Sequence, residues 1–106
     1  MPYTNAIVAV DEAKVHLNIF SNSDDQLIEA LCIASTEFIE NYCQRVLLGE
    51  DGYGYREDVP ETLKVCAKLL IGEWYLNREL STSPQHFECP LGIARLLAPY
   101  RKTEFN

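Results

Sequence analysis

The sequence has 106 residues, of which 47% are hydrophobic, so it is long enough for one domain and too apolar for a disordered chain. Its net charge of −7 has the wrong sign for binding the phosphate backbone of nucleic acids, although it suits a surface that DNA must pass without sticking. No apolar run reaches the roughly 18 residues of a membrane span, and the N-terminus lacks the pattern of a signal peptide. We expect one cytosolic domain over residues 1–106, with flexible ends at about 1–8 and 102–106.

Two helix-start patterns occupy the first quarter of the chain. Asp11 is a suitable N-cap for a short helix with the sequence DEAKVHLNI, whose apolar residues recur at helical spacing. Ser23 and Gln26 fit a capping box, with acidic residues between them where the helix dipole favours negative charge. This pattern predicts a second helix that runs to about Gln44.

The second helix is predicted to have one apolar half and one polar, largely acidic half, which includes Thr36. The apolar half is expected to form part of the core and includes Leu27, Leu31 and Phe38. Ile33 is the exception, because it lies alone among the acidic residues. A single exposed isoleucine needs no functional explanation, but it is also the first residue to test as a contact between subunits. The candidate contact on this face comprises Ile33, Glu37 and Glu40.

Residues 47–59 contain three glycines, several acids and two tyrosines, and we expect them to form a long acidic loop. The loop is too acidic to hold a phosphate group and lacks the P-loop order of residues. One interpretation is a solvated, mobile connection. The other is an adhesive loop, because Tyr53 and Tyr55 would add amphipathic contact area at little entropic cost.

Residues 60–80 form the longest apolar segment and contain the only tryptophan, Trp74. Pro60 suits the first turn of a helix, and no later proline interrupts the segment. Leu63, Leu70 and Trp74 share one stripe of the helical wheel and are predicted core residues. Because only a narrow strip of the wheel is fully polar, we expect this helix to have neighbours on most sides, some of them in another subunit.

Three polar residues lie within the apolar arc of this central helix, namely Glu73, Asn77 and Arg78. Their side chains would either extend to solvent near the helix end or form polar links across a subunit interface. The sequence leaves both interpretations open.

The C-terminal part is predicted as a loop over residues 81–92 and a last short helix over about 91–98, which Pro99 ends. A short basic and aromatic tail begins with Tyr100, Arg101 and Lys102. The predicted fold is therefore all-α, a small bundle of two long and two short helices with one long acidic loop.

The four cysteines have no metal-ligand spacing and are interpreted as reduced thiols, buried except for Cys89 in a predicted loop. The sequence has no nucleophile elbow, zinc-protease motif, P-loop or dinucleotide fingerprint. We therefore predict no catalytic residues, no metal site and no cofactor. Residue chemistry alone indicates a small acidic helical domain that forms oligomers.

The order of the segments is more specific than any one of them. The most distinctive are Lys14 to Leu17, EWYLNRE at 73–79 and PLGIARLLAPYR at 90–101. Together with the helix that starts SDDQLIEAL, they resemble the gp6-like phage head–tail connector family, which comprises small DNA-packaging adaptors of long-tailed phages and prophages. The resemblance covers about residues 8–101. One departure is Gln44, where the family often has glycine before the arginine that closes the second helix.

The resemblance implies a structural protein of the virion at the head–tail junction, assembled in the bacterial host cytoplasm, and not an enzyme. Such proteins form a homo-oligomeric ring on the portal protein, extend the channel for double-stranded DNA and carry the next neck or tail-completion protein. On this basis the Ile33–Glu40 face or the 47–59 loop would meet a neighbouring subunit. The segment from Tyr100 to Lys102 would dock on the portal, since it is basic and aromatic in an acidic chain.

Three other functions would make different demands on the sequence. Another neck or tail-completion protein would have similar size and helical content. A small helical regulator or DNA-binding module would need a basic stripe, which the sequence lacks. An enzyme subunit would need a catalytic constellation, which is also missing.

Overall fold

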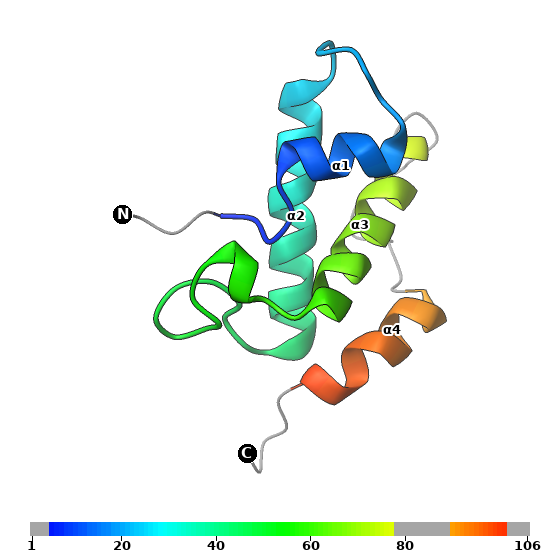
Figure 1. Ribbon diagram of the computed structural model, residues 1–106. Coiled ribbons are helices and arrows are strands. Elements are labelled where there is room, and N and C mark those ends of the chain that lie inside the picture. The colour runs from blue at the N-terminus through cyan, green and yellow to red at the C-terminus, as the bar shows by residue number, and fades with distance from the viewer. Residues whose placement is uncertain (1–4, 78–89, 102–106) are drawn as a thin grey trace.

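The computed structural model describes residues 5–77 and 90–101, and within these ranges it is all-α, without a β-strand (Figure 1). The predicted bundle of two long and two short helices is confirmed. Two 3-10 turns, η1 (Arg56–Asp58) and η3 (Ala98–Tyr100), accompany the helices. The helices are α1 (Val10–Leu17), α2 (Asp25–Cys43), α3 (Glu61–Leu76) and α4 (Leu91–Leu97).

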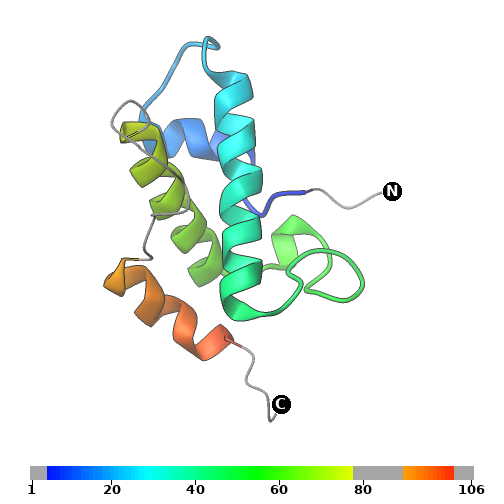
Figure 2. The same ribbon diagram turned by 180° about the vertical axis from the view of Figure 1, so that it is seen from behind.

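The two long helices, α2 and α3, pack side by side and form the centre of the domain (Figures 1 and 2). The short helix α1 lies across both of them, and α4 packs against α3. The N-terminal segment and the loop after α2 lie on the side of α2 that faces away from α3 (Figures 1 and 2). The domain therefore presents different elements on its two sides.

The N-cap of α1 is Ala9, two residues before the predicted N-cap Asp11. The helix begins at Val10, so Asp11 lies in the first turn and is not the N-cap. Glu12 takes over part of the capping, because its Oε1 accepts a hydrogen bond from the backbone N–H of Ala9 at 3.3 Å. The helix also ends earlier than predicted, since Asn18 adopts the left-handed conformation with φ +62°.

The predicted capping box at the start of α2 is wrong. The helix begins at Asp25 and not after Ser23, and the N-cap Asp24 makes no side-chain capping bond. Instead, Oδ2 of Asp24 accepts a 2.5 Å hydrogen bond from the hydroxyl of Tyr75 on α3. Oδ1 of Asp25 pairs with Nζ of Lys14 on α1 at 2.8 Å. These acids connect three helices, a role that local sequence cannot reveal.

The N-terminal segment before α1 belongs to the core. Ala6, Ile7 and Val8 are buried, so these three positions pack against the helices although they lie within the end expected to be flexible. The N–H of Ile7 donates a 2.9 Å hydrogen bond to Oγ1 of Thr36, and Nε of Arg56 donates to the carbonyl of Ala6 at 3.0 Å. Thr36, which the helical wheel placed on the polar half of α2, is therefore buried beneath this segment.

The C-terminal end of α2 lies where it was predicted, at Cys43, with Gln44 as the capping residue. Gln44 has φ +56° and ψ +42°, a left-handed conformation that glycine adopts without strain. The departure from the family pattern at this position therefore leaves the helix end in place, at the cost of backbone strain. The side chain of Gln44 is exposed.

Replacing Gln44 with glycine is therefore expected to stabilise the protein. The change removes the steric cost of a left-handed non-glycine residue, offset by the greater freedom of glycine in the unfolded chain, for a net gain of about 0.5 to 1 kcal/mol. Urea denaturation followed by circular dichroism would measure the free energy of unfolding. The matched control is Gln44→Ala, which keeps the strain, and an equal gain from both variants would contradict the explanation.

The end of α3 lies at Leu76, before the predicted end at Leu80. Asn77 forms the turn that follows, because its Nδ2 donates to the carbonyl of Glu73 at 2.7 Å. The backbone N–H of Asn77 donates to the same carbonyl at 3.1 Å, so this residue caps the helix end with both groups. The rest of the predicted helix lies outside the described residues.

Three of the four cysteines are buried free thiols, as predicted, and these are Cys32, Cys43 and Cys66. Burial raises the pKa of the Cys32 thiol from 9.0 to about 11, so the thiol stays neutral at physiological pH. Cys89 lies outside the described residues.

Candidate functional site

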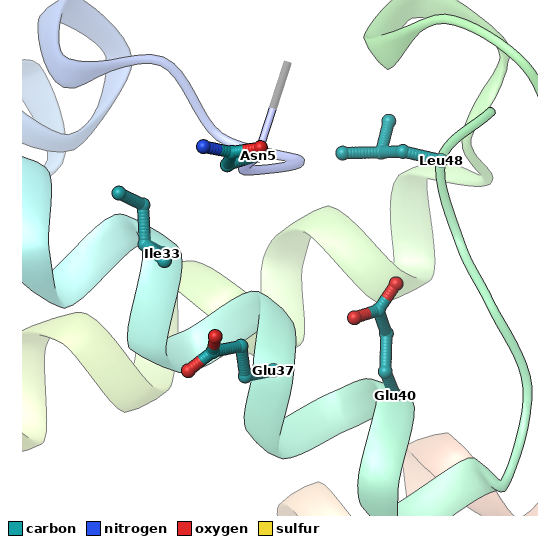
Figure 3. Close-up of a pocket in the computed structure, with 5 residues that line it drawn as sticks. All are labelled: Asn5, Ile33, Glu37, Glu40 and Leu48. Atoms are coloured by element: carbon teal, nitrogen blue, oxygen red, sulfur yellow. The ribbon is translucent and has the colours of Figure 1, made fainter. Parts of the chain in front are cut away.

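A concave surface lies on the outer side of α2, and we name it the acidic hollow. This open hollow has a volume of about 420 Å³ and is lined by Asn5, Ile33, Glu37, Glu40 and Leu48. Figure 3 shows the three α2 residues on one side of the hollow, with Asn5 and Leu48 opposite them. The candidate contact face Ile33–Glu40 of the sequence analysis thus forms one wall of a recess.

The lining of the acidic hollow combines apolar contact with negative charge. Ile33 and Leu48 are partly buried and pack against the core, so they are held in place. Oε2 of Glu40 accepts a 3.0 Å hydrogen bond from the backbone N–H of Leu47, which orients that carboxylate. Glu37 is exposed on the next turn. Such a surface fits a cationic side chain with an aliphatic stem.

The sequence identified the α2 wall of this hollow but missed Asn5 and Leu48. Asn5 comes from the segment that packs over Thr36, and Leu48 comes from the loop after α2. Both lie far from Ile33 in sequence or on an irregular element, so helical periodicity carried no signal for them. Ile33 itself is half-buried and not fully exposed as the wheel predicted.

The loop over residues 47–59 is folded against the domain. Its ends Leu47 and Val59 are buried, and Gly49 and Gly54 form an isolated antiparallel bridge with a 2.9 Å hydrogen bond. The loop therefore differs from the fully solvated connection that was one of the two interpretations. Its tyrosines have different surroundings, because Tyr53 packs against the core whereas Tyr55 is 49% exposed.

The C-terminal turn after α4 is attached to the end of α2. Nε of Arg45 donates a 2.8 Å hydrogen bond to the carbonyl of Tyr100, and Tyr100 also packs against the core. The guanidinium of Arg101 lies 5.1 Å from the ring centroid of Tyr42, within the range of a cation–π contact. Lys102 lies outside the described residues. Two arginines and two tyrosines thus meet at this end of the bundle.

The polar residues near the end of α3 interact with each other. Nδ2 of Asn77 donates to Oε1 of Glu73 at 3.1 Å as well as to its backbone carbonyl. Arg78 lies outside the described residues.

The excess apolar surface predicted for the central helix appears on the outer side of α3. Val65 and Leu69 are each 41% exposed and Leu76 is 76% exposed. Their spacing places them on one stripe of the helix, opposite the buried stripe that contains Leu63 and Leu70.

The predicted core residues differ in burial. Leu63 and Leu70 are fully buried, whereas the others are half-buried at the edge of the core. The half-buried residues are Leu27, Leu31, Phe38 and Trp74.

The sequence did not reveal the outer face of α4. Ile93 and Leu97 are buried, whereas Leu91 is 65% and Leu96 is 41% exposed. Arg95 is exposed on the same helix. In a helix of two turns, the periodicity is too short to separate an inner from an outer face.

No arrangement for metal binding or membrane insertion occurs in the described part of the chain. Within residues 5–77 and 90–101, no three His, Cys, Asp or Glu side chains gather in a way that would hold a metal ion. No described helix has the length and apolar character required to cross a membrane. The features that do occur are the acidic hollow beside α2 and the exposed apolar side chains of α3 and α4.

Comparisons with known proteins give a matching solved structure and a matching family. The fold matches the crystal structure of bacteriophage HK97 gp6 with a TM-score of 0.69 and 17% sequence identity, over 91% of this chain and 94% of that chain. No curated protein gives a significant match in sequence. The family model described as phage gp6-like head-tail connector protein matches residues 7–101. The chain therefore belongs to the phage gp6-like head-tail connector family.

Proposed function

We propose that this chain is a structural virion protein that assembles as a ring on the portal vertex and joins the head to the tail. The observation that carries the proposal is the family match over residues 7–101, together with a connector-like fold over nearly the whole chain. The ring would extend the channel for double-stranded DNA and present a platform for the next neck or tail-completion protein. It would form in the bacterial host cytoplasm and remain at the head–tail junction of the virion.

A ring requires a heterologous contact, in which one face of each subunit meets a different face of the next. The domain has suitable faces on its two sides. The acidic hollow lies beside α2, whereas the exposed apolar stripe lies on α3. These faces differ in shape and charge, which supports a head-to-tail arrangement.

The charge of the chain supports a role in DNA passage without DNA retention. Two described lysines form ion pairs within the domain, since Lys14 pairs with Asp25 and Lys68 lies 4.0 Å from Glu12. Exposed acids such as Glu29 remain on the surface. A negatively charged channel wall would repel the DNA backbone and lower its adhesion.

The C-terminal turn is the proposed contact with the portal. Arg45 and Tyr42 hold Tyr100 and Arg101 at one end of the bundle, and the proposed contact consists of these two residues and Lys102. Other candidates for contact with a neighbouring subunit are Tyr53, Tyr55, Glu73, Asn77 and Arg78, of which Tyr55 offers the largest described aromatic surface.

Co-sedimentation of the purified chain with its portal protein would test this function. We expect a stable complex in which electron microscopy shows an added ring on the portal axis. Binding to isolated tails but not to the portal would instead indicate another neck or tail-completion protein. Tight, salt-sensitive binding to DNA in a mobility-shift titration would contradict a channel role.

A chain that ends at Tyr100 tests the portal contact within the same experiment. This variant keeps the Arg45–Tyr100 bond but lacks Arg101 and the tail, so it should fold normally and bind the portal at least about tenfold more weakly. Lys64→Ala is the control, because it removes one positive charge from α3. Unchanged portal binding by the shortened chain would show that the tail is not the contact.

A further inference from the structure

We infer that the outer face of α4 in one copy docks into the acidic hollow of the next copy. This inference rests on the proposed ring and identifies its subunit contact. The outer face of α4 consists of Leu91, Arg95 and Leu96, and the hollow is the recess beside α2 that contains Glu37 and Glu40.

The hollow offers a carboxylate that nothing in the described structure uses. Among residues 5–77 and 90–101, Glu37 has neither an ion pair nor a side-chain hydrogen bond, and it is exposed. Glu40 is oriented by the N–H of Leu47, and its carboxylate also lines the recess. Ile33 and Leu48 supply apolar surface beside these acids (Figure 3). An arginine flanked by leucines would satisfy both parts of this lining.

The outer face of α4 has this composition. Leu91 and Leu96 expose 65% and 41% of their surface, and Arg95 lies one helical turn from Leu91. Within the described residues Arg95 has no ion pair or hydrogen bond, although the chain carries an excess of acids. An unpaired arginine between two exposed leucines is therefore available for a partner.

Other described cations are less suitable for the hollow because intramolecular contacts occupy them. Lys14 and Lys68 face carboxylates of their own chain. Three arginines are held by backbone carbonyls or an aromatic ring, namely Arg45, Arg56 and Arg101. Lys64 is half-buried on α3 and lacks an exposed leucine pair like that around Arg95.

The positions of the two surfaces favour contact between copies over contact within one copy. The N-terminal segment and the loop that bound the hollow lie on one side of α2, and α4 lies on the other side with α3 (Figures 1 and 2). One subunit therefore cannot fill its own hollow with its own α4. Repetition of the contact from copy to copy is the heterologous pairing that a ring requires.

Charge reversal at the two ends of the contact provides the test. Glu37→Arg and Arg95→Glu should each weaken self-association by about tenfold or more, because each places like charges opposite one another. Sedimentation velocity over a concentration series, alone and with the portal, would measure assembly. A mixture of the two single variants should assemble, because opposite charges face one another wherever the two variants alternate. The double variant should assemble as well.

The control is Glu29→Arg, which makes the same charge change on the same helix outside the hollow and should leave assembly unchanged. Far-ultraviolet circular dichroism would show that the exposed substitutions leave the fold intact. If the wild type assembles on the portal but neither reversal weakens assembly, or the mixture fails to restore it, the α4 contact is wrong and the proposed function stands. If the wild type neither self-associates nor binds the portal, the proposed function is wrong, and a second copy is not the occupant.

Discussion

Replacing Trp74 with alanine is expected to lower the free energy of unfolding by about 3 kcal/mol, near the lower end of the range for core aromatics. Trp74 is half-buried on α3 and packs against the core. Its ring meets Phe38 of α2 edge to face, with centroids 6.0 Å apart and planes at 75°, and Phe38 in turn stacks on Tyr42 at 6.4 Å. Loss of the indole would remove the aromatic contact between the two long helices.

Urea denaturation of the isolated domain would measure this loss. Leu76→Ala is the matched control on the same helix, because Leu76 is 76% exposed and should change the free energy of unfolding by less than about 0.5 kcal/mol. A loss below about 1 kcal/mol for Trp74→Ala, combined with failure to form a ring, would instead place Trp74 at a subunit interface.

Replacing Thr36 with valine is expected to lower the free energy of unfolding by about 2 kcal/mol, although the two side chains have nearly the same shape. Thr36 is 1% exposed, and its Oγ1 accepts the 2.9 Å hydrogen bond from the N–H of Ile7 while donating to the carbonyl of Cys32 at 3.0 Å. Valine would leave the buried N–H of Ile7 without an acceptor, so the N-terminal segment would detach more easily.

Hydrogen exchange at Ile7 and Val8, together with urea denaturation, would measure this effect. We expect faster exchange at these two amides in Thr36→Val. Ser35→Ala is the control, because Oγ of Ser35 bonds only the carbonyl of Cys32 at 2.9 Å and supports no distant segment. Equal losses in the two variants would show that the bond to Ile7 contributes little.

The fold class could be predicted from the sequence because several apolar residues repeat the same helical spacing in each long helix. Ile28, Ile39, Leu63 and Leu70 are buried and recur at helical spacing over helices long enough to define a face. The acidic loop and the prolines separate these helices, so the bundle follows from local patterns. The family resemblance depended on the order of segments and not on any one residue.

The candidate contact surfaces could be predicted from the sequence only in part. Ile33, Glu37 and Glu40 share one face of α2 by helical geometry, and the structure places them together at the hollow. The same wheel placed Thr36 among the polar residues. A helical wheel classifies threonine by its hydroxyl group and does not show whether that group is hydrogen-bonded to water or to the buried N–H of Ile7. The pairs Asp24–Tyr75 and Lys14–Asp25 were likewise invisible, since each joins different helices.

Local periodicity and composition thus determined the helices, the all-α class, the buried reduced cysteines at positions 32, 43 and 66, and the acidic character of the surface. Tertiary packing alone decided which polar groups are buried and which apolar groups remain outside. The segment at Ile7 converts a polar face of α2 into core, whereas α4 turns Leu91 and Leu96 outward. The physical reason is that the burial of a helix face depends on which distant element covers it. The periodic spacing of residues along a helix predicts only which residues share that face.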